Sequence, residues 1–374
     1  MPTPPRELPA PLRVLDRTWV VAGGQKLSYF CGCDYLGLSG HPEVLRALST
    51  ATMEYGASIG ASRITTGNHP LHLELEAALA QFFAVPAATL LPNGYTAVLA
   101  AAQALAGQFN VVFIDEKIHP AGRDGAACAG ARVQMFRHRD PADLARHLRR
   151  AGKRARPLVM ADGMFAFDGS LAPLAQYLAI LPAHGRLLVD DAQAAGVLGA
   201  QGRGTPEHAG ISPRQQARLI HVISLSKGFG TTGGAVLGSK ALRQAVISRS
   251  RIFSGSTPLS APLAAAALTA VRLAGDGSLR QRLWANVARV RAALANSRQA
   301  AAAPSPSPVV ALLPRNATDA AALRDLLQMT GIYPGFIHYP GGPRSGYFRL
   351  ALSSEHSAQQ ISALAAVLGA YYQA

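Results

Sequence analysis

One lysine, Lys227, follows an apolar run and precedes a turn rich in glycine. The segment HVISLSKGFGTTGG, residues 221–234, predicts a buried strand that ends near Ser224, with Lys227 just beyond it. Only five of the 36 basic residues are lysines, so a lysine at this place is conspicuous. Among small residues and partly withdrawn from water, its amine would be a usable nucleophile or base. The alternative is a surface lysine in a turn.

A second segment, LLPNGYTAV at residues 90–98, passes from an apolar strand into the expected start of a helix at Asn93, Gly94 and Tyr95. The first N–H groups of a helix have no partner within the helix and can hold a phosphate. Many strand-to-helix turns contain glycine, so the segment by itself also fits an ordinary turn.

Two further residues follow predicted strands. Asp190 ends the apolar run in LLVDDAQAAGVLG, residues 187–199, and a carboxylate there can pair with a protonated ring nitrogen. Asp191, next to it, is expected to support the local turn. His119, in FIDEKIHPAG, offers a flat ring that could stack on a flat cofactor, although a lone histidine is more often structural.

An amine, a phosphate cradle, a carboxylate for a ring nitrogen and a stacking ring together describe a pyridoxal phosphate (PLP) site. The lysine would form a Schiff base, and the protonated ring would act as an electron sink. The residues indicate no metal site, since Cys31 and Cys33 alone are too few ligands for zinc.

The elements that must position these residues alternate along the chain. Apolar segments predict seven strands of a mostly parallel sheet with helices between them, the pattern of an α/β fold. Polar residues follow several strands, and open α/β sheets bind ligands at that edge. The predicted strands are Ala88–Leu91, Val111–Asp115, Val133–Phe136, Leu158–Ala161, Arg186–Asp190, Ile220–Ser224 and Ala235–Leu237.

The pattern changes after about residue 258. Two long helices are expected at Leu259–Ala274 and Leu279–Ala293, and AAAAPSPSP at 300–308 is predicted to be a connector. A strand, a helix, a strand and a final helix complete a smaller α+β domain. We therefore divide the chain into an N-terminal segment (1–40, with a proline-rich extended arm at 1–12), a large PLP-binding domain (41–258) and a C-terminal part (259–374).

Composition limits the possible partners. The net charge is +15, but the arginines are scattered and form no basic arm, which argues against nucleic-acid binding. The sequence shows no apolar run long enough for a transmembrane helix and no secretory signal, so we expect a cytoplasmic protein.

Nearly the whole chain, from about Tyr29 onward, resembles the α-oxoamine synthases, a branch of the fold-type-I PLP enzymes. This branch includes 8-amino-7-oxononanoate synthase, glycine C-acetyltransferase and serine palmitoyltransferase. The matching stretches are CDYLGLSGHP (33–42), GASRITTGNHPLHLELE (60–76), PNGYTA (92–97), ADGMFAFDGSLAPL (161–174), VDDAQAAGVLGAQGRG (189–204), SLSKGFGTTGG (224–234) and YFRLALSSEH (347–356).

The resemblance implies a role for each matching position. Lys227 would be the Schiff-base lysine and the base for the Cα proton, Asp190 would contact the pyridine nitrogen, and His119 would stack on the ring. Arg349 would bind the substrate carboxylate. Family members are homodimers with shared active sites. The remaining implied contacts to the cofactor come from Asn93, Gly94, Tyr95, Asp162, Gln193 and Ser224, and from Ser254 and Ser256 in the neighbouring subunit's site.

Four positions depart from the family pattern. Gln193 stands where a histidine is usual and cannot titrate. Ala166 replaces a serine or threonine, and Asp162 replaces a glutamate. Cys33 stands where many members have an asparagine beside the substrate.

The leading functional hypothesis is an acyltransferase that condenses an amino acid with an acyl thioester, carried by coenzyme A or an acyl carrier protein. Loss of carbon dioxide would leave an α-aminoketone. The alternatives are an aminotransferase or another amino-acid Cα enzyme of the same fold, and a catalytically silent partner subunit.

Overall fold

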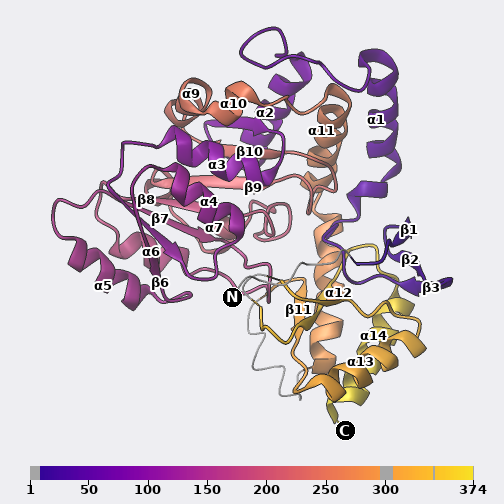
Figure 1. Ribbon diagram of the computed structural model, residues 1–374. Helices are drawn as coiled ribbons and strands as arrows, with labels where there is room; N and C mark the ends of the chain where they lie inside the picture. Colours follow the sequence, from indigo (N-terminus) through magenta and orange to yellow (C-terminus); the bar gives the residue numbers. More distant parts are fainter. Residues whose placement is uncertain (1–8, 295–305, 340–341, 374) are drawn as a thin grey trace.

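The computed structural model describes residues 9–294, 306–339 and 342–373 (Figure 1). Its centre is a seven-stranded sheet in the order β4-β10-β9-β8-β7-β5-β6. All neighbouring strands are parallel except that β10 runs antiparallel to β4 and β9. The predicted fold is confirmed. The strands are β4 (Ala87–Leu91), β5 (Val111–Asp115), β6 (Arg132–Phe136), β7 (Pro157–Asp162), β8 (Arg186–Asp190), β9 (Leu219–Ser224) and β10 (Gly234–Gly238).

Helices cover both faces of this sheet, as successive side chains of a buried strand require. In β5, Val112 and Ile114 pack in one apolar cluster with residues of α3 and α4. Val111 and Phe113, between and beside them, pack in another cluster with residues of α5 and α6. These helices are α3 (Gly94–Ala104), α4 (Pro120–Cys128), α5 (Pro141–Ala151) and α6 (Leu174–Ile180), joined by α1 (Pro42–Tyr55), α2 (Pro70–Phe82), α7 (Thr205–His208), α8 (Pro213–Gln216), α9 (Lys240–Arg249), α10 (Arg251–Gly255) and α11 (Ala261–Gly275).

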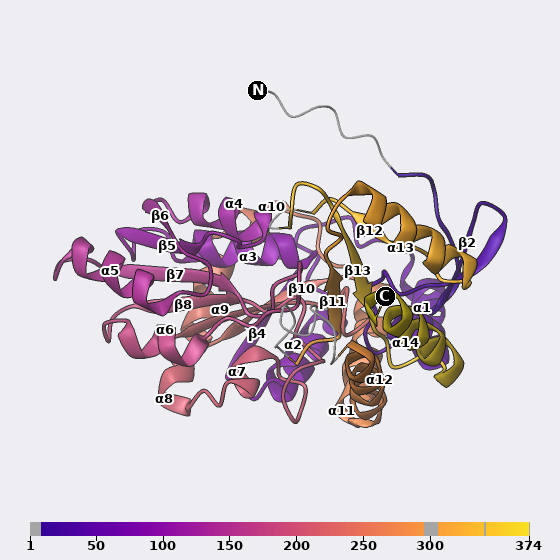
Figure 2. The ribbon, with the colours of Figure 1, turned by 90° about the horizontal axis from the view of Figure 1, so that it is seen from below.

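The C-terminal part forms a second layer beside the large sheet (Figure 2). A three-stranded antiparallel sheet has the order β11-β13-β12 and packs with three helices. The two strands and two helices predicted after the connector are present, and β12 was not predicted. The elements are α12 (Ser278–Leu294), β11 (Val309–Leu312), α13 (Ala317–Met329), β12 (Phe336–Ile337), β13 (Tyr347–Ala351) and α14 (Ala358–Gln373).

The N-terminal segment contains a small sheet that the sequence did not predict. It consists of β1 (Arg13–Asp16), β2 (Trp19–Ala22) and β3 (Gln25–Ser28), paired antiparallel. Residues 1–8 of the predicted arm lie outside the described residues, and residues 9–12 form no helix or strand. Residues 300–305 of the predicted connector also lie outside the described residues. The division into domains stays a prediction.

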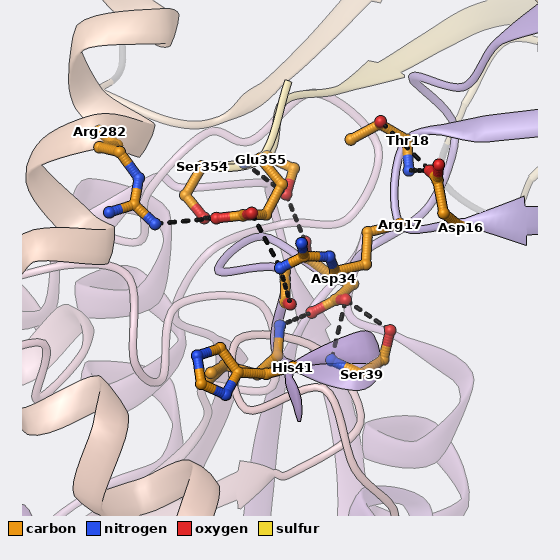
Figure 3. A network of polar contacts seen from close by, with 12 residues as sticks. Asp16, Arg17, Thr18, Asp34, Ser39, His41, Arg282, Ser354 and Glu355 are labelled. Carbon is orange, nitrogen blue, oxygen red and sulfur yellow. Dashed lines mark hydrogen bonds and ion pairs between the residues drawn. The ribbon is translucent and has the colours of Figure 1, made fainter. Parts of the chain in front are cut away.

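A network of ion pairs and hydrogen bonds joins the turn between β1 and β2, the segment after β3, α12 and the segment after β13 (Figure 3). Glu355 accepts from Arg17 at 2.8 Å and from Arg282 at 2.9 Å. The carboxylate of Asp34 accepts from the backbone N–H groups of Leu38 and Ser39. The main chain adds a bond from Ser354 N–H to Tyr35 O at 2.8 Å. Residues 33–35 are thereby held beside β13.

Within the described ranges, no helix combines the length and the apolar composition needed to cross a bilayer.

Candidate active site

The polar residues predicted at the strand ends meet in one cavity of about 260 Å³. It lies at the carboxyl edge of the sheet, where β7, β8 and β9 end. In the parallel register of β7 and β8, Asp162 pairs with Asp190. Nine of the predicted site residues line this cavity: Asn93, Gly94, Tyr95, His119, Asp162, Asp190, Gln193, Ser224 and Lys227.

A larger cavity of about 760 Å³ lies at the opposite edge of the sheet, where Leu219 begins β9 and Gly238 ends β10. None of the predicted site residues lines it. The predicted site residues therefore gather at the smaller cavity. This agrees with the rule that open α/β sheets bind ligands at the carboxyl ends of their strands.

The start of α3 forms an anion cradle on one wall of the cavity. The Asn93 side chain caps the helix by accepting from Thr96 N–H at 2.8 Å. The N–H groups of Gly94 and Tyr95 precede it in the first turn, where an α-helix offers no internal acceptors. A Cβ on Gly94 would lie 2.9 Å from the Cβ of Ser224, so only glycine lets the two segments approach this closely. The helix dipole also favours an anion here.

The carboxylates of Asp162 and Asp190 are buried side by side. Burial, and then the neighbouring Asp190, raises the pKa of Asp162 well above its usual range. Burial likewise raises the pKa of Asp190, although Lys227 and His119 oppose the shift. Asp162 accepts from His119 N–H at 3.2 Å with both oxygens. Among the described residues, the Asp190 carboxylate accepts one hydrogen bond, from Ala192 N–H at 3.1 Å. It therefore retains an oxygen for a cationic partner.

Replacing Asp162 by asparagine is expected to stabilise the cofactor-free protein more at pH 8 than at pH 5. The pKa of Asp162 is higher in the folded than in the unfolded protein. The free energy of unfolding is therefore greatest below the unfolded-state pKa, and it falls as pH rises toward the folded-state pKa. Asparagine removes this titration. Thermal unfolding of both apoproteins should show a gain in melting temperature at pH 8 that exceeds the gain at pH 5 by about 2 °C or more. An equal gain at both pH values would contradict this assignment.

The neighbouring Asp191 does not line the cavity. It accepts from Thr205 N–H at 2.8 Å and lies 3.0 Å from His221 Nε2, which is buried on β9. Its carboxylate thus holds the loop after β8 to the α7 segment. This agrees with the structural role expected for it.

His119 caps α4 and presents its ring to the cavity. Its Nδ1 accepts from Ala121 N–H at 3.1 Å, so Nε2 carries the proton and donates to the Tyr339 hydroxyl at 2.9 Å. Burial lowers the pKa of His119, and Lys227 lowers it further, while Asp190 opposes the shift. A neutral ring is therefore favoured at this wall of the cavity.

Arg349 lies behind the cavity, on β13. It donates to Ala166 O at 2.8 Å and to the Tyr35 hydroxyl at 3.3 Å, and it lies 3.6 Å from Cys33 Sγ. The Tyr35 hydroxyl in turn donates to Gln193 Oε1 at 2.5 Å. The structure thus brings Arg349 and Cys33 together and links them to the cavity wall.

Ser254 and Ser256 are not brought to the cavity of this chain. Ser254 belongs to α10, where its hydroxyl donates back to Arg251 O at 3.2 Å, and Ser256 caps the end of that helix. Sequence reasoning had assigned both to a neighbouring subunit's site, and that assignment stays a prediction.

Two tyrosines at the site were missed by sequence reasoning. Tyr35 bridges Arg349 and Gln193, and Tyr339 contacts His119. Tyr35 lies inside the motif CDYLGLSGHP, which could have drawn attention to it. Nothing in the stretch around Tyr339 distinguishes it from other surface-loop tyrosines.

Known proteins match this chain along nearly its full length. The family model "Aminotransferase class I and II" matches residues 28–368. The 8-amino-7-oxononanoate synthase of Thioalkalivibrio sulfidiphilus is 37% identical over 347 residues, which cover 92% of this chain and 88% of the relative. Among solved structures, a serine palmitoyltransferase variant from S. paucimobilis with bound PLP–myriocin aldimine has a TM-score of 0.89 at 27% identity, covering 96% and 91% of the two chains. An 8-amino-7-oxononanoate synthase from Francisella tularensis has a TM-score of 0.78 at 25% identity, covering 93% and 98%.

The fold and the site therefore define a fold-type-I PLP-dependent transferase, as the sequence predicted. Within that class, the chain belongs to the aminotransferase class I and II family and to its α-oxoamine synthase branch.

The residues present fit this cofactor. The α3 terminus offers N–H groups for a phosphate, and Gly94 keeps that approach open. Asp190 has an oxygen free for a protonated ring nitrogen, and Lys227 lines the same cavity. The polar groups of the cavity thus match the phosphate, the ring nitrogen and the aldehyde of PLP.

Proposed function

We propose that this chain is an acyltransferase that condenses an amino acid with an acyl thioester, carried by coenzyme A or an acyl carrier protein, and releases the free thiol, carbon dioxide and an α-aminoketone. The names of its relatives support this, since an 8-amino-7-oxononanoate synthase and a serine palmitoyltransferase are among them. The observation that carries the proposal is a buried arginine, Arg349, beside the Lys227 cavity.

Arg349 is only 7% exposed, and no carboxylate of the described residues pairs with it. Its protein partners are a carbonyl, a hydroxyl and a thiol. A buried guanidinium without a carboxylate partner is a site where a substrate carboxylate would pair with its charge. Arg349 donates to Ala166 O and is connected through Tyr35 to Gln193, and both Ala166 and Gln193 line the cavity. These contacts support a role for Arg349 in binding the carboxylate of an amino acid.

The other residues would act on the two ends of the bound cofactor. PLP supplies an electron sink for the carbanion formed at Cα. Lys227 would hold the cofactor before substrate arrives and then take the Cα proton on its amine. Asp190 would keep the ring nitrogen protonated, and the α3 terminus would bind the phosphate with Ser224. His119 would lie against the ring.

We further propose a homodimer with shared active sites, in which Ser254 and Ser256 reach the partner's phosphate site. Their position away from the cavity of their own chain is compatible with this. Sedimentation of the purified protein gives its mass, and mixing inactive Lys227→Ala chains with inactive Ser256→Ala chains would restore activity only if sites are shared.

An aminotransferase is the second candidate. Gln193 favours it, because the α-oxoamine synthases usually have a titratable histidine there. Incubation with amino acids and acyl-coenzyme A separates the two reactions. Free thiol and carbon dioxide indicate acyl transfer, whereas a 2-oxo acid with pyridoxamine phosphate indicates transamination.

Arg349→Ala is expected to weaken amino-acid binding about 30-fold, because a carboxylate then loses a charged hydrogen-bond partner worth about 2 kcal/mol or more. The dissociation constant of the amino acid can be followed through the absorption of bound PLP. Affinity for PLP itself should be nearly unchanged. Arg324→Ala, which removes an exposed arginine of α13, is the matched control. Unaltered amino-acid affinity in Arg349→Ala would remove Arg349 from the substrate site.

A further inference from the structure

Three buried side chains from distant parts of the chain form a short line of hydrogen bonds. Arg349 NH2 donates to the Tyr35 hydroxyl at 3.3 Å, and that hydroxyl lies 2.5 Å from Gln193 Oε1. Tyr35 is 1% exposed, and the other two are 7% exposed. Gln193 lines the PLP cavity, whereas Tyr35 does not. The line therefore runs from the proposed carboxylate site to the cofactor site.

The groups themselves determine which side chain donates and which accepts in each of these hydrogen bonds. A guanidinium has donors and no acceptor, so the Tyr35 oxygen must accept from Arg349. Two oxygens at 2.5 Å need a proton between them. The amide oxygen of Gln193 carries none, so the Tyr35 hydroxyl donates its single proton to Gln193. Burial raises the pKa of Tyr35, so the hydroxyl keeps that proton.

The amide of Gln193 can thus adopt one orientation. Its oxygen is turned toward Tyr35, and its NH2 group is left as the part that can meet a ligand in the cavity. The competing acceptor for the Tyr35 proton is Cys33 Sγ, since the two side chains also interact. A sulfur is a weak acceptor compared with an amide oxygen at 2.5 Å.

We propose that Tyr35 is a positioning residue that locks Gln193 as a hydrogen-bond donor toward the bound PLP and couples it to Arg349. This inference rests on the proposed function and deepens it. Gln193 would present N–H to an oxygen of the cofactor at every pH, unlike a histidine, whose donor state changes with protonation. A substrate carboxylate would bind the same guanidinium that donates to the Tyr35 hydroxyl. Binding at the substrate site and binding at the cofactor site would therefore be coupled through this hydroxyl.

A double-mutant cycle in the PLP-loaded protein tests the proposal, with Tyr35→Phe and Gln193→Met as the two changes. Phenylalanine keeps the ring and removes the hydroxyl. Methionine keeps the length of the glutamine side chain and removes both the oxygen and the NH2 group of its amide. The measurements are the PLP dissociation constant and the pH at which the visible absorption of bound PLP titrates. Tyr333→Phe, at a half-buried tyrosine outside the line, is the control.

In the Gln193 background, Tyr35→Phe is expected to raise the PLP dissociation constant roughly 5-fold and to move the titration midpoint by about half a pH unit or more, because the amide can then rotate. In the Gln193→Met background, Tyr35→Phe should change either quantity less than about 2-fold. Equal effects of Tyr35→Phe in both backgrounds overturn the proposal.

A second variant covers the case in which Tyr35→Phe fails to fold. Gln193→Glu keeps shape and exchanges the NH2 donor for an acceptor, so it should weaken PLP binding about 5-fold or more. Unchanged PLP affinity and titration in Gln193→Glu would also overturn the proposal. A wild-type protein that binds no PLP would instead defeat the proposed function itself, so the two failures are distinguishable.

Discussion

Lys227→Ala is expected to lower turnover by about 10⁴-fold, because it removes both the amine that would hold PLP and the base for the Cα proton. Lys227 lines the cavity together with Asp190 and the α3 terminus. The PLP-loaded variant should still bind the cofactor through its phosphate and ring nitrogen, but without a covalent link. Turnover is measured as free thiol released from an acyl-coenzyme A.

Borohydride treatment gives an independent measurement of the same prediction. In the wild-type protein, peptide mass spectrometry after reduction should find the cofactor mass on Lys227. Lys240→Ala is the matched control, since Lys240 begins α9, where it is exposed. A cofactor mass on another lysine, or full turnover in Lys227→Ala, would refute the assignment and favour the silent-subunit hypothesis.

Asp190→Ala is expected to lower turnover by about 10² to 10³-fold while the protein stays folded, because a carboxylate buried beside the ring nitrogen would be lost as an electrostatic partner. The cavity would still contain Lys227 and the phosphate cradle, so PLP should bind, more weakly. The absorption of the bound cofactor and the rate of thiol release together measure this.

Asp191→Asn provides the control for Asp190, because the two carboxylates are adjacent in sequence and face different partners. Asp191 contacts Thr205 and His221 in the interior. Its replacement should lower the melting temperature and leave the rate per folded, PLP-loaded molecule nearly unchanged. If Asp191→Asn lost as much turnover as Asp190→Ala, the division of roles between the two carboxylates would be wrong.

Much of the large sheet could be predicted because its strands are buried on both faces and therefore appear as continuous apolar runs. The ends of these runs also revealed Asp190, Ser224 and Lys227. The short strands β1 and β2 were missed because their side chains are mostly exposed or half-buried, which leaves no apolar run to recognise.

The contacts that complete the site could not be predicted from spacing. Tyr35 and Gln193 are 158 positions apart, and His119 and Tyr339 are 220 apart. Only tertiary packing decides that these pairs meet. The same holds for the raised pKa of Asp162, which depends on its register neighbour Asp190 and on the helices that exclude water from both.

Tyr35 and Arg349 are 314 positions apart, so they are synthesised at different times. Residues 93–227 contain the proposed phosphate cradle, the ring-nitrogen carboxylate and the lysine, so these groups are made before Arg349. Arg349 lies 122 positions after Lys227 (349 − 227) and is made later. A nascent chain therefore acquires the groups for its cofactor well before it can recognise an amino acid.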